Sequence, residues 1–159
     1  HIYHVPRSAL DAHLAAARSR AVFPPGSESP VNSPPTVGDW LQFQGYEIAN
    51  PEAQPGDSLL VFTYWRVLQP PPNITLFVHL LAADDQLVTQ YDGFDVVVDD
   101  LATGDLVVQL HTLELPPYMP DGLYRLAVGA YTREDLERIP LSTGSDHVVL
   151  EPWQLVQNQ

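Results

Sequence analysis

Residues 116–131 read PPYMPDGLYRLAVGAY and place a turn directly before a strand. Pro120 restricts φ for the turn, and Gly122 allows the positive φ that a tight exit requires. After this turn, apolar residues occupy both faces of an extended segment, and Arg125 is its only charge. A strand that is apolar on both faces is covered on both sides, so we expect this one in the middle of a sheet. Gly129, inside the strand, predicts a close approach by another backbone or by a bulky ring.

The rest of the chain repeats this pattern of short apolar segments separated by turns. The candidate strands cover residues 40–49, 58–67, 74–82, 86–92, 94–100, 105–115, 122–131 and 147–156. Breaks rich in Pro, Gly, Asn and Asp separate them and leave no room for crossover helices. The sequence therefore predicts an all-β fold, an antiparallel β-sandwich of jelly-roll or immunoglobulin-like type.

The N-terminal part has a different character. Residues 7–22 favour a short helix, with Ser8 as its N-cap and a thin apolar stripe that is mostly Ala. Residues 23–38 are rich in Pro and Ser, which is typical of an extended linker. We expect an N-terminal helical segment over residues 1–22, a linker over 23–38 and the β-sandwich domain over 39–159.

Composition excludes several classes of function. The 159 residues include 20 Asp and Glu against 7 Lys and Arg, which gives a net charge of −13. Such a surface repels phosphate backbones and anionic lipids, so we expect no nucleic-acid partner and no direct membrane insertion. Cysteine is absent, which excludes disulfides and thiol nucleophiles. No apolar stretch approaches the ~20 residues that cross a bilayer, and the start at His1 without a signal segment leads us to expect a fragment or a processed product.

No pattern identifies catalytic or metal-binding residues. A Gly-x-Ser-x-Gly elbow is lacking, and His79 and His111 lie within strands, where we expect them to be hydrogen-bonded rather than catalytic. Carboxylates gather in residues 99–105 and would suit Ca²⁺, but Leu101 and Thr103 occupy positions where a calcium loop carries Asp or Asn. The sequence therefore predicts no catalytic residue, no cofactor and no metal, and a hydrolase based on acidic residues remains an alternative.

The first strand carries candidate glycan-binding residues. Simple alternation places Trp40, Gln42, Gln44 and Tyr46 on one face, opposite Leu41 and Phe43. Aromatic rings beside amides on an open sheet face stack on a pyranose and hydrogen-bond its hydroxyls. The alternative is that the linker or a neighbouring strand covers these rings.

Several short motifs together resemble a known domain family. They are Gly45-Tyr46, the PGD turn at 55–57, YWR at 64–66, FVHLL at 77–81, Gln90 with Asp92-Gly93, and the P-x-G-x-Y-x-L-x-V-G-x-Y strand at 120–131. In this order they resemble the soluble C-terminal β-sandwich domain of bacterial membrane glycosyltransferases, which are related to protein mannosyltransferases (family 39 type). The resemblance covers about residues 38–150. It departs at FDVVVDDLATGDL (94–106), where similar domains often carry Pro-Thr-Ser-x-Trp.

The resemblance implies an accessory role, because such domains lack the catalytic carboxylates of the transferase. It implies an extracytoplasmic domain, tethered to the membrane by another part of the chain, whose partners are a glycan or the membrane-embedded domain of the same chain. A free-standing carbohydrate-binding module is the alternative, besides the acidic hydrolase.

Overall fold

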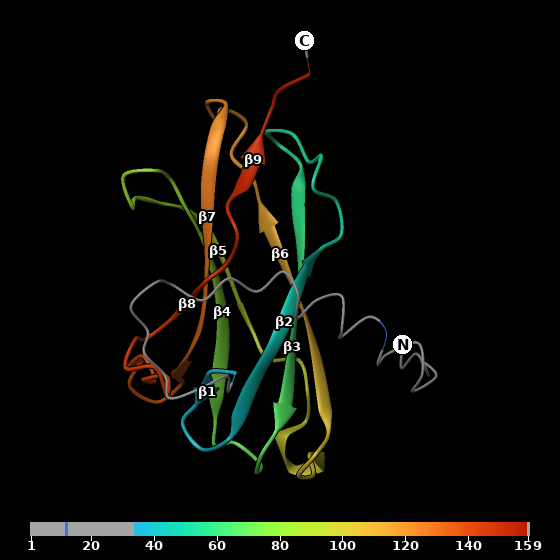
Figure 1. Ribbon diagram of the computed structural model, residues 1–159, viewed down its shortest axis with the longest axis vertical. Coiled ribbons are helices and arrows are strands. Elements are labelled where there is room, and N and C mark those ends of the chain that lie inside the picture. The colour runs from blue at the N-terminus through green and yellow to red at the C-terminus, as the bar shows by residue number, and fades with distance from the viewer. Residues whose placement is uncertain (1–11, 13–33, 159) are drawn as a thin grey trace.

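The computed structural model describes Ala12 and residues 34–158 of the chain. These residues form two antiparallel β-sheets stacked face to face (Figure 1). The predicted antiparallel β-sandwich is therefore confirmed. Almost all of the predicted helix over 7–22, and the linker as far as residue 33, lie outside the described residues.

The first sheet, sheet A, has four strands in the order β1-β2-β3-β6. Their bounds are Thr36–Val37 for β1, Leu41–Ile48 for β2, Ser58–Val67 for β3 and Leu106–Glu114 for β6. The strand β1 lies at the end of the segment predicted as linker, and it pairs with the start of β2.

The second sheet, sheet B, has the order β5-β4-β7-β8, and β9 pairs with the other end of β7. Its bounds are Ile74–Leu81 for β4, Leu87–Gly93 for β5, Gly122–Thr132 for β7, Val148–Val149 for β8 and Trp153–Leu155 for β9. The strand β7 begins at Gly122 of the PPYMPDGLYRLAVGAY stretch and lies inside the sheet, as predicted.

The core lies between the two sheets. Trp65 of β3 and Phe43 of β2 meet edge to face, with ring centroids 5.1 Å apart, and both are buried. Gly129 of β7 faces away from this core, and a Cβ there would lie 2.5 Å from Cζ of Phe77 and 2.7 Å from the carbonyl oxygen of Asp146. The close approach predicted at Gly129 is confirmed, and it involves both a ring and a backbone.

Two candidate strands differ from the prediction. Residues 94–100 are not a strand but a loop that contains the 3₁₀ helix η1, Val98–Asp100. Residues 147–156 form the two short strands β8 and β9 instead of one. Pro152 lies between them, and because proline has no backbone N–H, it interrupts the hydrogen bonding to β7.

Candidate functional site

A β-bulge separates the four residues that simple alternation groups on one face. Phe43 pairs with Trp65, but the next pair is Gly45 with Tyr64, so Gln44 is an extra residue in β2. Gly45 has φ 135°, a backbone conformation that favours glycine. A bulge of one residue reverses the alternation beyond it. The prediction of a shared face is therefore wrong.

The four side chains have different surroundings. Tyr46 belongs to the core cluster and is 4% exposed, while Trp40 is partly buried against the core, with its ring over Gly38. The amide of Gln44 donates to Oε1 of Gln42 at 2.8 Å. Whether any of the four binds glycan stays a prediction; Tyr46 lines a pocket between β2 and β9 whose lining residues do not include the other three.

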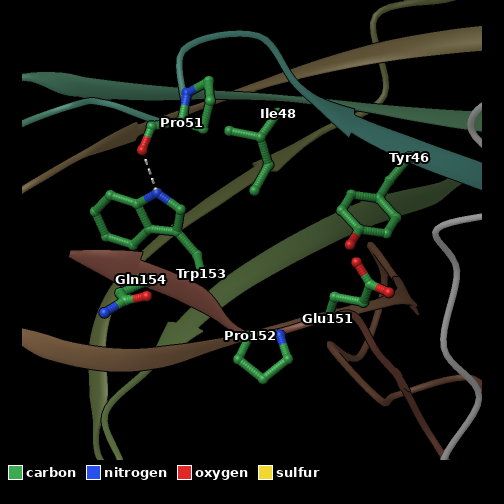
Figure 2. A pocket seen from close by; sticks show the side chains of 7 residues that line it. All are labelled: Tyr46, Ile48, Pro51, Glu151, Pro152, Trp153 and Gln154. Carbon is green, nitrogen blue, oxygen red and sulfur yellow. Dashed lines mark hydrogen bonds between the residues drawn. The ribbon is translucent and has the colours of Figure 1, made fainter.

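That pocket opens between the end of β2 and the strand β9, and its volume is about 330 Å³. Its lining residues come from three segments and are Tyr46, Ile48, Pro51, Glu151, Pro152, Trp153 and Gln154 (Figure 2). The indole N–H of Trp153 donates to the carbonyl oxygen of Pro51 at 2.9 Å, which holds the β2–β3 loop beside β9. Figure 2 shows the hydroxyl of Tyr46 and the carboxylate of Glu151 pointing toward one another.

A second pocket, of about 360 Å³, continues from the first. Its lining residues are Pro51, Glu52, Ala53, Gln54, Gln154, Val156 and Asn158, so the two pockets share Pro51 and Gln154. The side chain of Gln54 fixes this part, because its amide donates to the carbonyl oxygen of Val156 at 3.1 Å and its Oε1 accepts from the backbone N–H of Asn158 at 2.9 Å. We call the two pockets together the edge groove.

The edge groove combines apolar rings with hydrogen-bonding groups and negative charge. Tyr46 and Trp153 are core residues, 4% and 3% exposed, so their rings are almost wholly covered, and the exposed rings of Pro51 and Pro152 supply most of the C–H surface. Glu52 and Glu151 are exposed acids, whereas no Arg or His lines either pocket. The groove therefore offers mainly acceptors, with amides from Gln154 and Asn158 that both donate and accept, whereas the amide of Gln54 is already bonded to the C-terminal segment.

Most residues of the edge groove were not predicted from the sequence. Only Tyr46 was a candidate, and its position in the groove depends on the bulge rather than on alternation. Gly45 inside a strand is the signal that predicts such a bulge. The remaining lining residues lie in a turn and around Pro152, where sequence indicates a break but not which breaks meet in space.

A second cluster of rings lies on the outer face of sheet B. Phe77 packs against His79, with centroids 4.5 Å apart, and stacks on Tyr131 at 6.3 Å. The guanidinium of Arg138 lies 4.9 Å from the centroid of Phe77, and Phe77 is only 1% exposed. The ring is thus already covered by the segment that follows β7. We interpret this ring cluster as a clamp that holds that segment on the sheet.

Hydrogen bonds and ion pairs support the clamp. The hydroxyl of Tyr131 donates to Oδ2 of Asp92 at 3.1 Å, and burial followed by this hydrogen bond raises the pKa of Tyr131. Arg138 pairs with Asp146 at 3.0 Å, and Nδ1 of His147 lies 2.6 Å from the same carboxylate. The hydrogen bond from His147 is the main cause that lowers the pKa of Asp146. Burial and then the charge of Arg138 lower the pKa of His79.

The other strand histidine lies in the core. His111 is fully buried, its Nε2 is 2.9 Å from the hydroxyl of Thr63, and that hydroxyl also accepts from the indole N–H of Trp65 at 2.9 Å. Burial lowers the pKa of His111 to about 4. The prediction of a hydrogen-bonded strand histidine is confirmed for His111, which has no access to a substrate.

Metal ligands do not gather in the part of the chain that the structure describes. Within residues 34–158 no three His, Asp or Glu side chains are placed to hold an ion. In the acidic segment 99–105, Oδ2 of Asp105 accepts from the backbone N–H of Ala102 at 2.8 Å and so closes a turn. Over the same residues, no helix has the length and apolar character needed to span a bilayer.

Comparison with known proteins shows the fold but not a family. No family model matches the chain, and no curated protein does. Among solved structures, the chain is similar to the crystal structure of the C-terminal domain of Wzt, with a TM-score of 0.60 and 11% sequence identity. The match covers 91% of this chain and 86% of that one. At this identity the likeness establishes a shared β-sandwich, and the resemblance to glycosyltransferase domains depends on the quoted motifs alone.

Proposed function

We propose that the chain is a non-catalytic accessory domain that binds a glycan in the edge groove. The observation that carries the proposal is the composition of the groove, in which the exposed rings of Pro51 and Pro152 lie beside carboxylates and amides. Sugars present C–H surface on one side and a ring of hydroxyls at the rim. A site with both apolar rings and several hydrogen-bonding groups matches that chemistry.

The construction of the groove also supports binding without catalysis. Its walls are fixed before any ligand arrives, because Trp153 is bonded to Pro51 and Gln54 is bonded to the C-terminal segment. A preformed site loses less conformational entropy on binding. The histidine with the most strongly shifted pKa, His111, is buried between the sheets and cannot act on a ligand in the groove.

For the cellular setting we propose an extracytoplasmic domain tethered to the membrane by another part of the same protein. The motifs shared with membrane glycosyltransferase C-terminal domains support this proposal. The solved structure that the chain matches is itself described as a C-terminal domain, which agrees with a position at the end of a longer chain. We predict that the upstream coding sequence contains many apolar spans, and an upstream sequence without them would contradict this setting.

A glycan array followed by calorimetry tests the binding function. We expect binding of at least one glycan class to the wild-type chain and a loss of about tenfold or more in Glu151→Gln, since the change replaces a charged acceptor at the groove with a neutral amide. Glu134→Gln is the matched control, because Glu134 is an exposed acid outside the groove and the change in charge is the same. Binding that is absent, or that is equal in all variants, would contradict the proposal.

A further inference from the structure

The edge groove has two adjoining pockets and carboxylates in its lining, and both features restrict its ligand further. Resting on the proposed function, we infer that the ligand is a glycan of at least two sugar residues that carries no acidic group. Two observations support the inference independently: the division of the groove into two adjoining pockets, and the charge of its lining residues.

The two pockets correspond to two binding positions along one chain. They are of similar size, about 330 Å³ and about 360 Å³, and each has its own carboxylate, Glu151 in the first and Glu52 in the second. Gln154 and Pro51 line both pockets, so a ligand that passes from one to the other contacts them at the junction. An extended oligosaccharide has this repeating form, because each residue presents the same groups at a regular spacing. The second residue adds contacts without a second loss of translational freedom.

The charges select against acidic sugars. Glu52 and Glu151 flank the groove, and none of the arginines in residues 34–158 lines either pocket. Those arginines are engaged elsewhere: Arg66 donates to the carbonyl oxygen of Gly104, Arg125 pairs with Asp85, and Arg138 pairs with Asp146. Arg133 donates to Thr75 on sheet B. A uronic acid or a phosphorylated sugar would meet two like charges, and no lining residue that the structure describes is a cation that could offset them. Hydroxyl and ammonium groups, in contrast, donate to these carboxylates.

Titration calorimetry on the full chain tests both parts. The neutral probes are glucose, galactose, mannose and N-acetylglucosamine, each as a series of one to four residues. The acidic probes are galacturonic, glucuronic and mannuronic acid oligomers of the same lengths, and glucosamine oligomers supply the positive charge. We expect at least about tenfold tighter binding of a neutral disaccharide than of its monosaccharide, and about tenfold weaker binding of the matched acidic oligomer at low salt.

Two variants separate the pockets. Glu52 lines the second pocket only. Glu52→Gln should therefore weaken binding of the disaccharide several-fold and leave the affinity for a monosaccharide bound in the first pocket unchanged. In the double variant E52Q/E151Q, the affinities for the acidic and the neutral oligomer should lie within about threefold of each other. The control Glu134→Gln should leave the difference between these two affinities as it is in the wild type.

The outcomes are distinct. Equal affinity for one and two residues would overturn the two-position inference but leave glycan binding in place. Acidic oligomers that bind as tightly as neutral ones would overturn the charge selection in the same way. If none of these glycans bound, the proposed function would fail together with the inference.

Discussion

Acid should destabilise this fold through one buried side chain, His111. The imidazole is fully buried between the sheets, and burial lowers its pKa from 6.5 to about 4. Burial is the largest cause of this shift in pKa, and a backbone hydrogen bond with Tyr91 and the charge of Asp95 offset it only in part. In the unfolded chain the same side chain takes up a proton near its ordinary pKa.

The size of the effect follows from the two pKa values. Because the folded-state pKa is depressed, the stabilisation is fully present above pH 6.5 and is lost as the pH falls toward 4. Proton linkage gives a loss of about 2 kcal/mol between pH 7.5 and pH 5, where most carboxylates are still ionised. For a domain of this size, that loss lowers the urea midpoint by roughly 1 M.

Urea unfolding followed by tryptophan fluorescence at both pH values measures this loss. His111→Gln is neutral throughout, so it should be less stable at pH 7.5 but should lose almost nothing further at pH 5. The matched control is His147→Gln, since His147 is half-buried at the surface, and it should retain the wild-type loss. A wild-type loss below about 0.5 kcal/mol, or an equal loss in His111→Gln, would show that His111 is not the source of the acid sensitivity.

Two further predictions concern the outer face of sheet B. Gly129→Ala should lower the free energy of unfolding in urea by about 2–3 kcal/mol, because the added methyl group meets the ring of Phe77 and the backbone at Asp146, which cannot both move aside. Unchanged stability would contradict this packing. Arg138→Ala should accelerate hydrogen exchange at the backbone N–H of Ile139 by about threefold to tenfold, because it removes the guanidinium that covers Phe77. This N–H donates to the carbonyl oxygen of Ala130 in the wild type, and exchange in β3 should stay the same.

Much of the fold could be predicted from the sequence because the deciding signals are local. The Pro120–Gly122 turn, the strand apolar on both faces and the glycine within it all act over a few residues, and the structure has each of them. The strand predicted over residues 94–100 was wrong because it too was inferred from local signals alone. Three consecutive valines favour a strand locally, but the segment leaves the sheet after β5 and crosses to β6, so no neighbour pairs with it.

The candidate site was less predictable, because it depends on contacts between residues that are far apart in the sequence. Tyr46 faces inward only because Gln44 is an extra residue in β2, and one residue of shift moves every later side chain to the other face. The groove then forms where the turn at Pro51 meets Trp153, about a hundred residues later in the chain. Neither segment contains a motif that predicts contact with the other, so the pocket could not be predicted from the sequence alone.

The most direct test of glycan binding in the edge groove is an NMR titration of the ¹⁵N-labelled chain with the tightest oligosaccharide from the array. The chain has three tryptophans, so the indole N–H of Trp153 can be assigned with a Trp153→Phe variant. If the oligosaccharide lies in the edge groove, this signal and the side-chain amides of Gln54 and Gln154 should shift together and saturate at one affinity. Shifts confined to the ring cluster around Phe77 and Tyr131, with the Trp153 indole unchanged, would contradict binding there.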